Sequence, residues 1–81
     1  MEITVRVKLR SILKRYGKNK SQDGFEVTLP ENSSVEALIL NLEIPQRLVG
    51  MAMVGLDRVE GPRILANGDE VLLFPPMLAG G

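Results

Sequence analysis

The chain begins with a strict alternation of apolar and polar residues over positions 3–9. One face is apolar and rich in β-branched side chains, reading Ile3, Val5, Val7 and Leu9. A period of two predicts a strand with one buried face. Residues 25–29 repeat the pattern, and Pro30 ends this second strand because proline cannot donate to a sheet. We expect the two strands to form a hairpin whose connection holds a helical turn at residues 11–16, closed by Gly17.

A helix is indicated by the spacing of residues 33–42. Ser33 and Glu36 have capping-box spacing, in which the hydroxyl and the carboxylate each satisfy a free backbone N–H. Behind them, apolar residues at i, i+3, i+4 and i+7 form one stripe that consists of Val35, Leu38, Ile39 and Leu42. We expect Pro45 to end this helix or to begin a separate turn at residues 44–48.

The stretch from Val49 to Val54 is an almost continuous apolar run. Such a run predicts a central strand that is buried on both faces, with Met51 and Met53 filling the core. A weak strand is expected around Arg58-Val59. The order and type of the elements so far leave room for one more strand in the last third of the chain.

That last strand is predicted at residues 70–74. An Asn-Gly-Asp turn at residues 67–69 leads into it, and Pro75 and Pro76 end it. The elements together predict an α+β fold in which one main helix packs on one mixed sheet, the β-grasp arrangement. We divide the chain into a β-grasp domain at residues 1–74 and an extended, flexible diglycine tail at residues 75–81.

Composition limits the chemistry that this chain can perform. Its 81 residues suffice for a single domain. The chain has no cysteine and no histidine, so it lacks a thiolate, the commonest general base and the commonest metal ligand. We therefore expect no catalytic residue, no metal site and no bound cofactor. The alternating start is neither a signal peptide nor a membrane span, which predicts a cytoplasmic protein without a membrane partner.

Charge is balanced overall, with ten basic and ten acidic residues, but it is distributed unevenly. Residues 1–20 carry seven basic side chains against Glu2 alone. Such a distribution is typical of a solvated face or of a surface that steers a partner. Nucleic-acid binding is disfavoured because stacking platforms are scarce: the aromatic residues are Tyr16, Phe25 and Phe74.

The final seven residues have the properties of a segment that is inserted into another protein. Pro75 and Pro76 favour an extended path away from the sheet, followed by Met77, Leu78 and Ala79. Gly80 and Gly81 lack Cβ atoms and can pass through a narrow channel. The alternative is a frayed terminus, since two glycines in two given places occur by chance in about 0.5% of sequences.

Three groups of residues resemble a known family. They are the Asn-Gly-Asp-Glu-Val sequence at residues 67–71, Phe-Pro-Pro at residues 74–76, and Gly-Gly at residues 80–81. They are similar to the MoaD/ThiS family of ubiquitin-like sulfur carriers, and the Phe-Pro-Pro sequence favours the molybdopterin synthase small subunit, MoaD, over ThiS, the carrier for the thiazole of thiamine. The likeness covers the whole chain in element order and implies the strand order of the β-grasp sheet.

The resemblance implies a carrier rather than an enzyme. An E1-like adenylating enzyme would use ATP and Mg²⁺ to convert the Gly81 carboxylate to an acyl-adenylate, and a sulfur donor protein would displace AMP to leave a thiocarboxylate. The large subunit of molybdopterin synthase would then receive the tail, and the sulfur would enter the molybdenum or tungsten cofactor. A ThiS-type carrier, a covalent protein modifier and a plain interaction domain remain alternatives.

The last strand also suggests a docking surface. Val71 and Leu73 share one face, and Leu72 and Phe74 share the other. We expect Leu72 and Phe74 to be exposed and to bind both partners beside the tail. The alternative is that both faces of this strand are covered within the domain.

Overall fold

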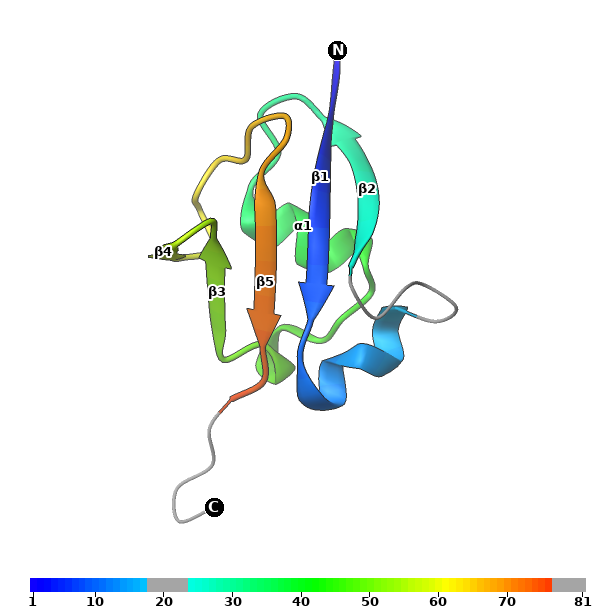
Figure 1. Ribbon diagram of the computed structural model, residues 1–81, viewed down its shortest axis with the longest axis vertical. Helices are drawn as coiled ribbons and strands as arrows, with labels where there is room; N and C mark the ends of the chain where they lie inside the picture. The colour runs from blue at the N-terminus through cyan, green and yellow to red at the C-terminus, as the bar shows by residue number, and fades with distance from the viewer. Residues whose placement is uncertain (18–23, 77–81) are drawn as a thin grey trace.

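One mixed sheet of five strands organises the computed structural model, which describes residues 1–17 and 24–76 (Figure 1). The strands are β1 (Glu2–Leu9), β2 (Phe25–Pro30), β3 (Met51–Val54), β4 (Asp57–Val59) and β5 (Glu70–Phe74). Their order is β2-β1-β5-β3-β4, with β5 parallel to β1 and antiparallel to β3. Together with one α-helix, this sheet confirms the predicted α+β, β-grasp fold.

The first two strands form the predicted antiparallel hairpin. Their register pairs Val5 with Val27, so the apolar positions of both strands share one face. The connection contains η1 (Ser11–Gly17), a 3-10 helix where the short helical turn was predicted. Leu13 of η1 is fully buried. The weak strand expected around Arg58-Val59 is also present, as β4.

The single α-helix of the described residues, α1, spans Val35–Asn41 and is therefore only two turns long. Its N-cap is Ser34, whose Oγ accepts a hydrogen bond from the Ala37 N–H at 3.1 Å. The predicted cap at Ser33 is wrong by one position, because the Ser33 hydroxyl donates to the Pro30 carbonyl at 2.6 Å. Either of the two adjacent serines could cap the helix by its residue type, and the backbone geometry selects Ser34.

The first turn of α1 is tied to the segment between β4 and β5. The Val35 N–H donates to the Arg63 carbonyl, and the Glu36 N–H donates to the Gly61 carbonyl, both at 2.9 Å. These are backbone donors that have no partner within the helix. The Leu65 N–H in turn donates to the Ser33 carbonyl at 2.8 Å. Backbone hydrogen bonds thus fix the helix start on the rest of the domain.

A Schellman motif ends α1. The Glu43 N–H donates to the Leu40 carbonyl and the Ile44 N–H donates to the Ile39 carbonyl, with Leu42 as C-cap. Glu43 adopts the left-handed conformation at φ 60° that this motif requires. The helix therefore ends before Pro45 is reached, so the prediction that Pro45 ends it is wrong. The alternative that Pro45 begins a separate turn is confirmed by η2 (Gln46–Leu48), which has Pro45 as its N-cap.

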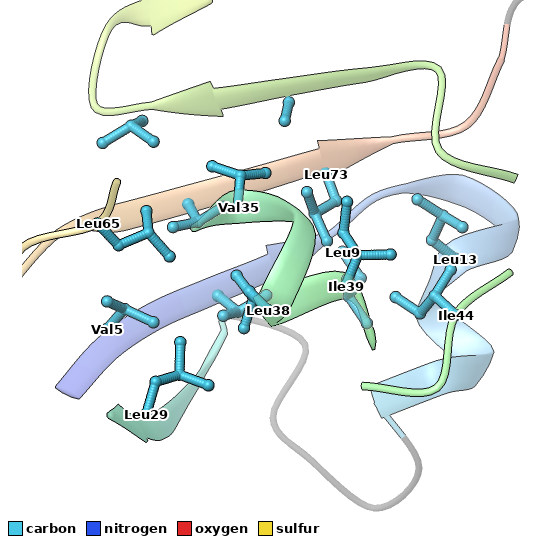
Figure 2. Close-up of a cluster of buried hydrophobic side chains, with 14 of the residues drawn as sticks. Val5, Leu9, Leu13, Leu29, Val35, Leu38, Ile39, Ile44, Leu65 and Leu73 are labelled. Carbon is cyan, nitrogen blue, oxygen red and sulfur yellow. The ribbon is translucent and has the colours of Figure 1, made fainter. Parts of the chain in front are cut away.

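The core lies between α1 and one face of the sheet (Figure 2). It consists of Ile3, Val5, Val7, Leu9, Leu13, Leu29, Val35, Leu38, Ile39, Ile44, Ala52, Val54, Leu65, Val71 and Leu73. Within the described ranges no polar or charged side chain is buried. The fold therefore derives its stability mainly from apolar burial on one side of the sheet.

The other face of β3 is open, which corrects the prediction for this strand. Ala52 and Val54 are buried, whereas Met51 and Met53 are only half-buried and lie on the opposite face. The two methionines therefore do not fill the core. A continuous apolar run indicates burial on both faces only when both faces are covered, and α1 covers one.

None of the helices in the described part of the chain is long and apolar enough to cross a membrane.

Candidate functional site

The C-terminal end of β5 is held by backbone hydrogen bonds from both sides. The Arg10 N–H, following β1, donates to the Leu73 carbonyl at 3.1 Å. The Gly50 N–H, preceding β3, donates to the Phe74 carbonyl at 2.8 Å. Because β5 lies between β1 and β3, its end has a fixed position in the middle of the sheet. The start of the predicted tail is anchored at that point.

The two faces of β5 have different environments. Val71 and Leu73 have no exposed surface and face the core. Leu72 and Phe74 lie on the opposite face, which the helix does not cover, and both are half-buried. The structure therefore assigns the two faces of β5 as the sequence predicted. It does not fully expose Leu72 and Phe74, because each has an apolar neighbour on β3.

These neighbours complete an apolar surface on the open face. Phe74 is directly opposite Met51, and Leu72 is directly opposite Met53. We call Met51, Met53, Leu72 and Phe74 the open-face cluster. The sequence analysis identified the two β5 members but placed the methionines in the core. The alternation of β3 with Ala52 and Val54 was the signal that could have identified them.

Basic residues flank the open-face cluster on both sides. Lys8 of β1 is paired with Leu72, and Arg58 of β4 is paired with Met53. A row of side chains across the sheet therefore runs from a lysine through two apolar residues to an arginine. An apolar centre with a charged rim is typical of protein-binding surfaces rather than of a catalytic site.

Gly50 lies directly under the first residues of the predicted tail, and we call this contact the tail root. A Cβ atom added to Gly50 would overlap the Cα of Pro76 and would lie 2.7 Å from the Pro76 nitrogen and 2.9 Å from the Pro75 carbonyl oxygen. Its φ is outside the left-handed region, so space rather than backbone torsion requires glycine here. No sequence pattern identified this residue, because the contact joins positions 25 and 26 residues apart in the chain.

The remaining predicted site residues lie outside the described part of the chain. These are Met77, Leu78, Ala79, Gly80 and Gly81, and their proposed roles stay predictions. Pro75 is half-buried and Pro76, the last described residue, is exposed. β5 ends at Phe74, and the division of the chain into a domain and a tail at that residue stays a prediction.

The described residues offer little catalytic chemistry of their own. Among them, no group of three or more acidic side chains is arranged to hold a metal ion. A hollow of about 240 Å³ lies between α1, η2 and the β3–β4 edge, next to Gly50 and Met51. Its charged residues are Glu36, Arg58 and Glu60, all exposed, and no nucleophile accompanies them. The arrangement of the described residues suits binding and presentation of a chain terminus.

Comparison with known proteins gives structural neighbours only. No protein family and no curated protein matches the sequence. Among solved structures, the chain is similar to a Pyrococcus furiosus protein provisionally named molybdopterin converting factor, subunit 1. The TM-score is 0.71 and the identity 22%, over 93% of this chain and 99% of that one.

Two further neighbours have archaeal sources. SAMP1 from Haloferax volcanii has a TM-score of 0.66 and 18% identity, covering 96% of this chain and 99% of the neighbour. The ubiquitin of Caldiarchaeum subterraneum has a TM-score of 0.61 and 12% identity, with both chains fully covered. At these identities the likeness concerns the fold. The chain therefore has the ubiquitin-like β-grasp fold, with the end of its last strand anchored at the centre of the sheet beside an open apolar face.

Proposed function

We propose that this protein is a sulfur carrier whose reactive group is the Gly81 carboxylate. The observation that carries the proposal is the anchoring of the end of the central strand β5, which is held between Arg10 and Gly50 beside the open-face cluster. This geometry fixes the point at which the chain leaves the sheet. The Pyrococcus neighbour with a molybdopterin-related name supports the same direction.

In the proposed reaction the chemistry belongs to the partners. A carboxylate is a poor electrophile, so an E1-like adenylating enzyme uses ATP and Mg²⁺ to form a Gly81 acyl-adenylate and pyrophosphate. A sulfur donor protein supplies the sulfur that displaces AMP, which leaves a thiocarboxylate. The large subunit of molybdopterin synthase then accepts the tail, and the sulfur is transferred to the molybdopterin precursor. The chain itself supplies no acid, base, metal ligand or bound cofactor, and it acts in the cytoplasm.

The open-face cluster is proposed to be the docking surface for both partners. Leu72 and Phe74 lie on the strand that continues into the tail, so a partner that binds them is adjacent to the tail root. Aromatic and methionine side chains are enriched in the centres of such interfaces. Phe74→Asp places a charge there and is expected to weaken both complexes. Thr28→Asp, on the same face but on β2, is the matched control and should bind normally.

The mass of the intact protein from its native cell tests the carrier function. Exchange of one Gly81 oxygen for sulfur supports it. Deletion of Gly81 should abolish this mass change, whereas Ala79→Gly keeps the length and the terminal glycine and should preserve it. A native protein that carries only the oxygen form, in cells actively making molybdopterin, would contradict the proposal.

A covalent protein modifier is the second candidate, and the likeness to an archaeal ubiquitin favours it. The same adenylation would precede an isopeptide bond between Gly81 and a lysine of a target protein. Higher-mass conjugates that disappear on deletion of Gly81, without a thiocarboxylate, would assign the protein to this class. A ThiS-type carrier would instead show the thiocarboxylate and a dependence of thiamine synthesis on the chain.

A further inference from the structure

Exposed cations gather at the end of the domain from which the tail leaves. We call Arg10, Lys14, Arg15 and Arg47 the basic end. Arg10 follows β1 and is bound through its N–H to Leu73, and the next two lie in η1. Arg47 lies in η2, three residues before Gly50, which forms the tail root with Pro75 and Pro76. Figure 1 shows both 3-10 helices at the end of the sheet where β5 runs toward the C-terminus.

The four basic side chains are available to a partner. All are exposed, and none forms an ion pair or a side-chain hydrogen bond with any residue that the structure describes. Glu43 is one acidic residue near this end, because it precedes the core residue Ile44, which packs beside Leu13 of η1 (Figure 2). The four residues of the basic end therefore carry four positive charges that no ion pair with a described residue neutralises.

The opposite end of the domain has the opposite character. Four carboxylates lie near the start of β1 or β5 or in the turns beside them, and they belong to Glu2, Glu31, Asp69 and Glu70. Arg6 of β1 is paired with Glu70 of β5, so part of this acidic charge has a basic neighbour. Arg10, Lys14 and Arg15 lie at the basic end because β1 is parallel to β5 and both strands finish there.

Because the tail is short, any protein that reacts with Gly81 must come close to the basic end. Five residues follow Pro76, and fully extended they span at most about 18 Å. A partner that encloses the terminal carboxylate in an active site must therefore approach the tail root closely. Its surface then faces the end of the domain that carries the four cations, and charges closer than the Debye length of roughly 10 Å interact with little screening.

We infer that the basic end docks against an acidic protein surface surrounding the opening through which the tail enters the activating enzyme. This inference rests on the proposed function, because it takes Gly81 as the reacting residue. Uncompensated cations facing a neutral or basic rim would oppose each productive encounter, whereas an acidic rim would accelerate association. Nucleic acid fits the basic end less well, because its one aromatic residue, Tyr16 of η1, is partly buried against the core.

The test measures adenylation of the full chain by the E1-like enzyme of the same cell, through ATP–pyrophosphate exchange. Arg15→Glu should raise KM by about threefold and Lys14→Glu with Arg15→Glu by about tenfold at low salt, with kcat unchanged. Raising the ionic strength from about 0.05 M to about 0.5 M should remove most of the difference. Arg63→Glu, an exposed arginine between β4 and β5, makes the same charge change away from the basic end and should leave KM unaltered.

The outcomes separate the two proposals. If the charge reversals in η1 leave the KM for adenylation unchanged, and the variants keep the wild-type unfolding midpoint, the acidic-surface inference alone is overturned. Equal effects of Arg15→Glu and Arg63→Glu also overturn it, since only general net charge would then matter. Absence of adenylation of the wild-type chain overturns the proposed function and the inference with it. Retention of single-stranded DNA that is lost on charge reversal in η1 assigns the basic end to nucleic acid and overturns the inference.

Discussion

Substitution of Gly50 by alanine should dislodge the tail root and destabilise the protein through that contact alone. The added Cβ would lie 2.7 Å from the Pro76 nitrogen, whereas ordinary contact begins at 3.4 Å, so the Pro75-Pro76 backbone must move by at least about 0.7 Å. That movement strains the hydrogen bond from the Gly50 N–H to the Phe74 carbonyl. The direction of the tail should therefore change where it leaves the sheet.

The size of the effect follows from three contributions. Overpacking typically costs about 1–3 kcal/mol, and loss of a backbone hydrogen bond costs about 0.5–1.5 kcal/mol. Replacing glycine with alanine at an allowed torsion returns about 0.4–1 kcal/mol by restricting the unfolded chain. We expect Gly50→Ala to lower the free energy of unfolding of the full chain by about 1–3 kcal/mol. With the m-value of a small domain, this moves the urea midpoint by about 1 M.

A chain that ends at Phe74 provides the decisive comparison. All buried core residues lie between Ile3 and Leu73, so this shorter chain retains the core. Without Pro75 and Pro76 the added Cβ loses its clashing partners, and Gly50→Ala should be neutral or slightly stabilising. Gly61→Ala is the matched control, because its Cβ meets only the flexible Glu36 side chain, and its effect should not depend on chain length. Equal destabilisation of the long and short chains by Gly50→Ala would refute the steric role assigned to Gly50.

Chemical denaturation of substituted proteins tests three further features of the fold. Leu73→Ala should cost about 2–5 kcal/mol because this side chain is fully buried, whereas Leu72→Ala should cost less than about 1.5 kcal/mol; equal costs would contradict the assignment of the two β5 faces. Ser34→Ala should lower the free energy of unfolding by about 0.5–2 kcal/mol through loss of the N-cap. A larger decrease in Ser33→Ala would indicate that Ser33 is the N-cap after all. Glu43→Gly should stabilise the protein by about 0.5–1 kcal/mol, because glycine adopts the required left-handed conformation without strain; a destabilised variant would show that the Glu43 side chain has a role that the Schellman motif does not explain.

Local patterns were sufficient to predict most of the elements. The alternation in β1, β2 and β5 depends only on neighbouring side chains meeting opposite environments, and a strand has a period of two wherever one face is buried. The same alternation correctly separated Leu72 and Phe74 from Val71 and Leu73. The capping frame and the helix end were missed because Ser33, Ser34 and Glu43 each satisfy or tolerate more than one local arrangement. Only the path of the backbone selects among these.

The methionines show where local reasoning ends. Met51 and Met53 belong to an apolar run whose sequence does not state which face of β3 is covered. The position of α1 on one side of the sheet decides this, and it leaves the methionines beside Leu72 and Phe74. A surface made from two strands that are distant in the sequence cannot be predicted from the periodicity of either strand alone.

The sequence by itself determined the class of fold, the apolar and polar faces of three strands and the candidate terminus, because each depends on residues close together in the chain. Tertiary structure alone decided that Gly50 lies under Pro75 and Pro76, that methionines complete the open-face cluster, and that four cations lie at the end of the domain from which the tail leaves. All three arise from the pairing of β5 between β1 and β3. Strand pairing brings together residues that are far apart in the chain, so their proximity is a property of the folded sheet.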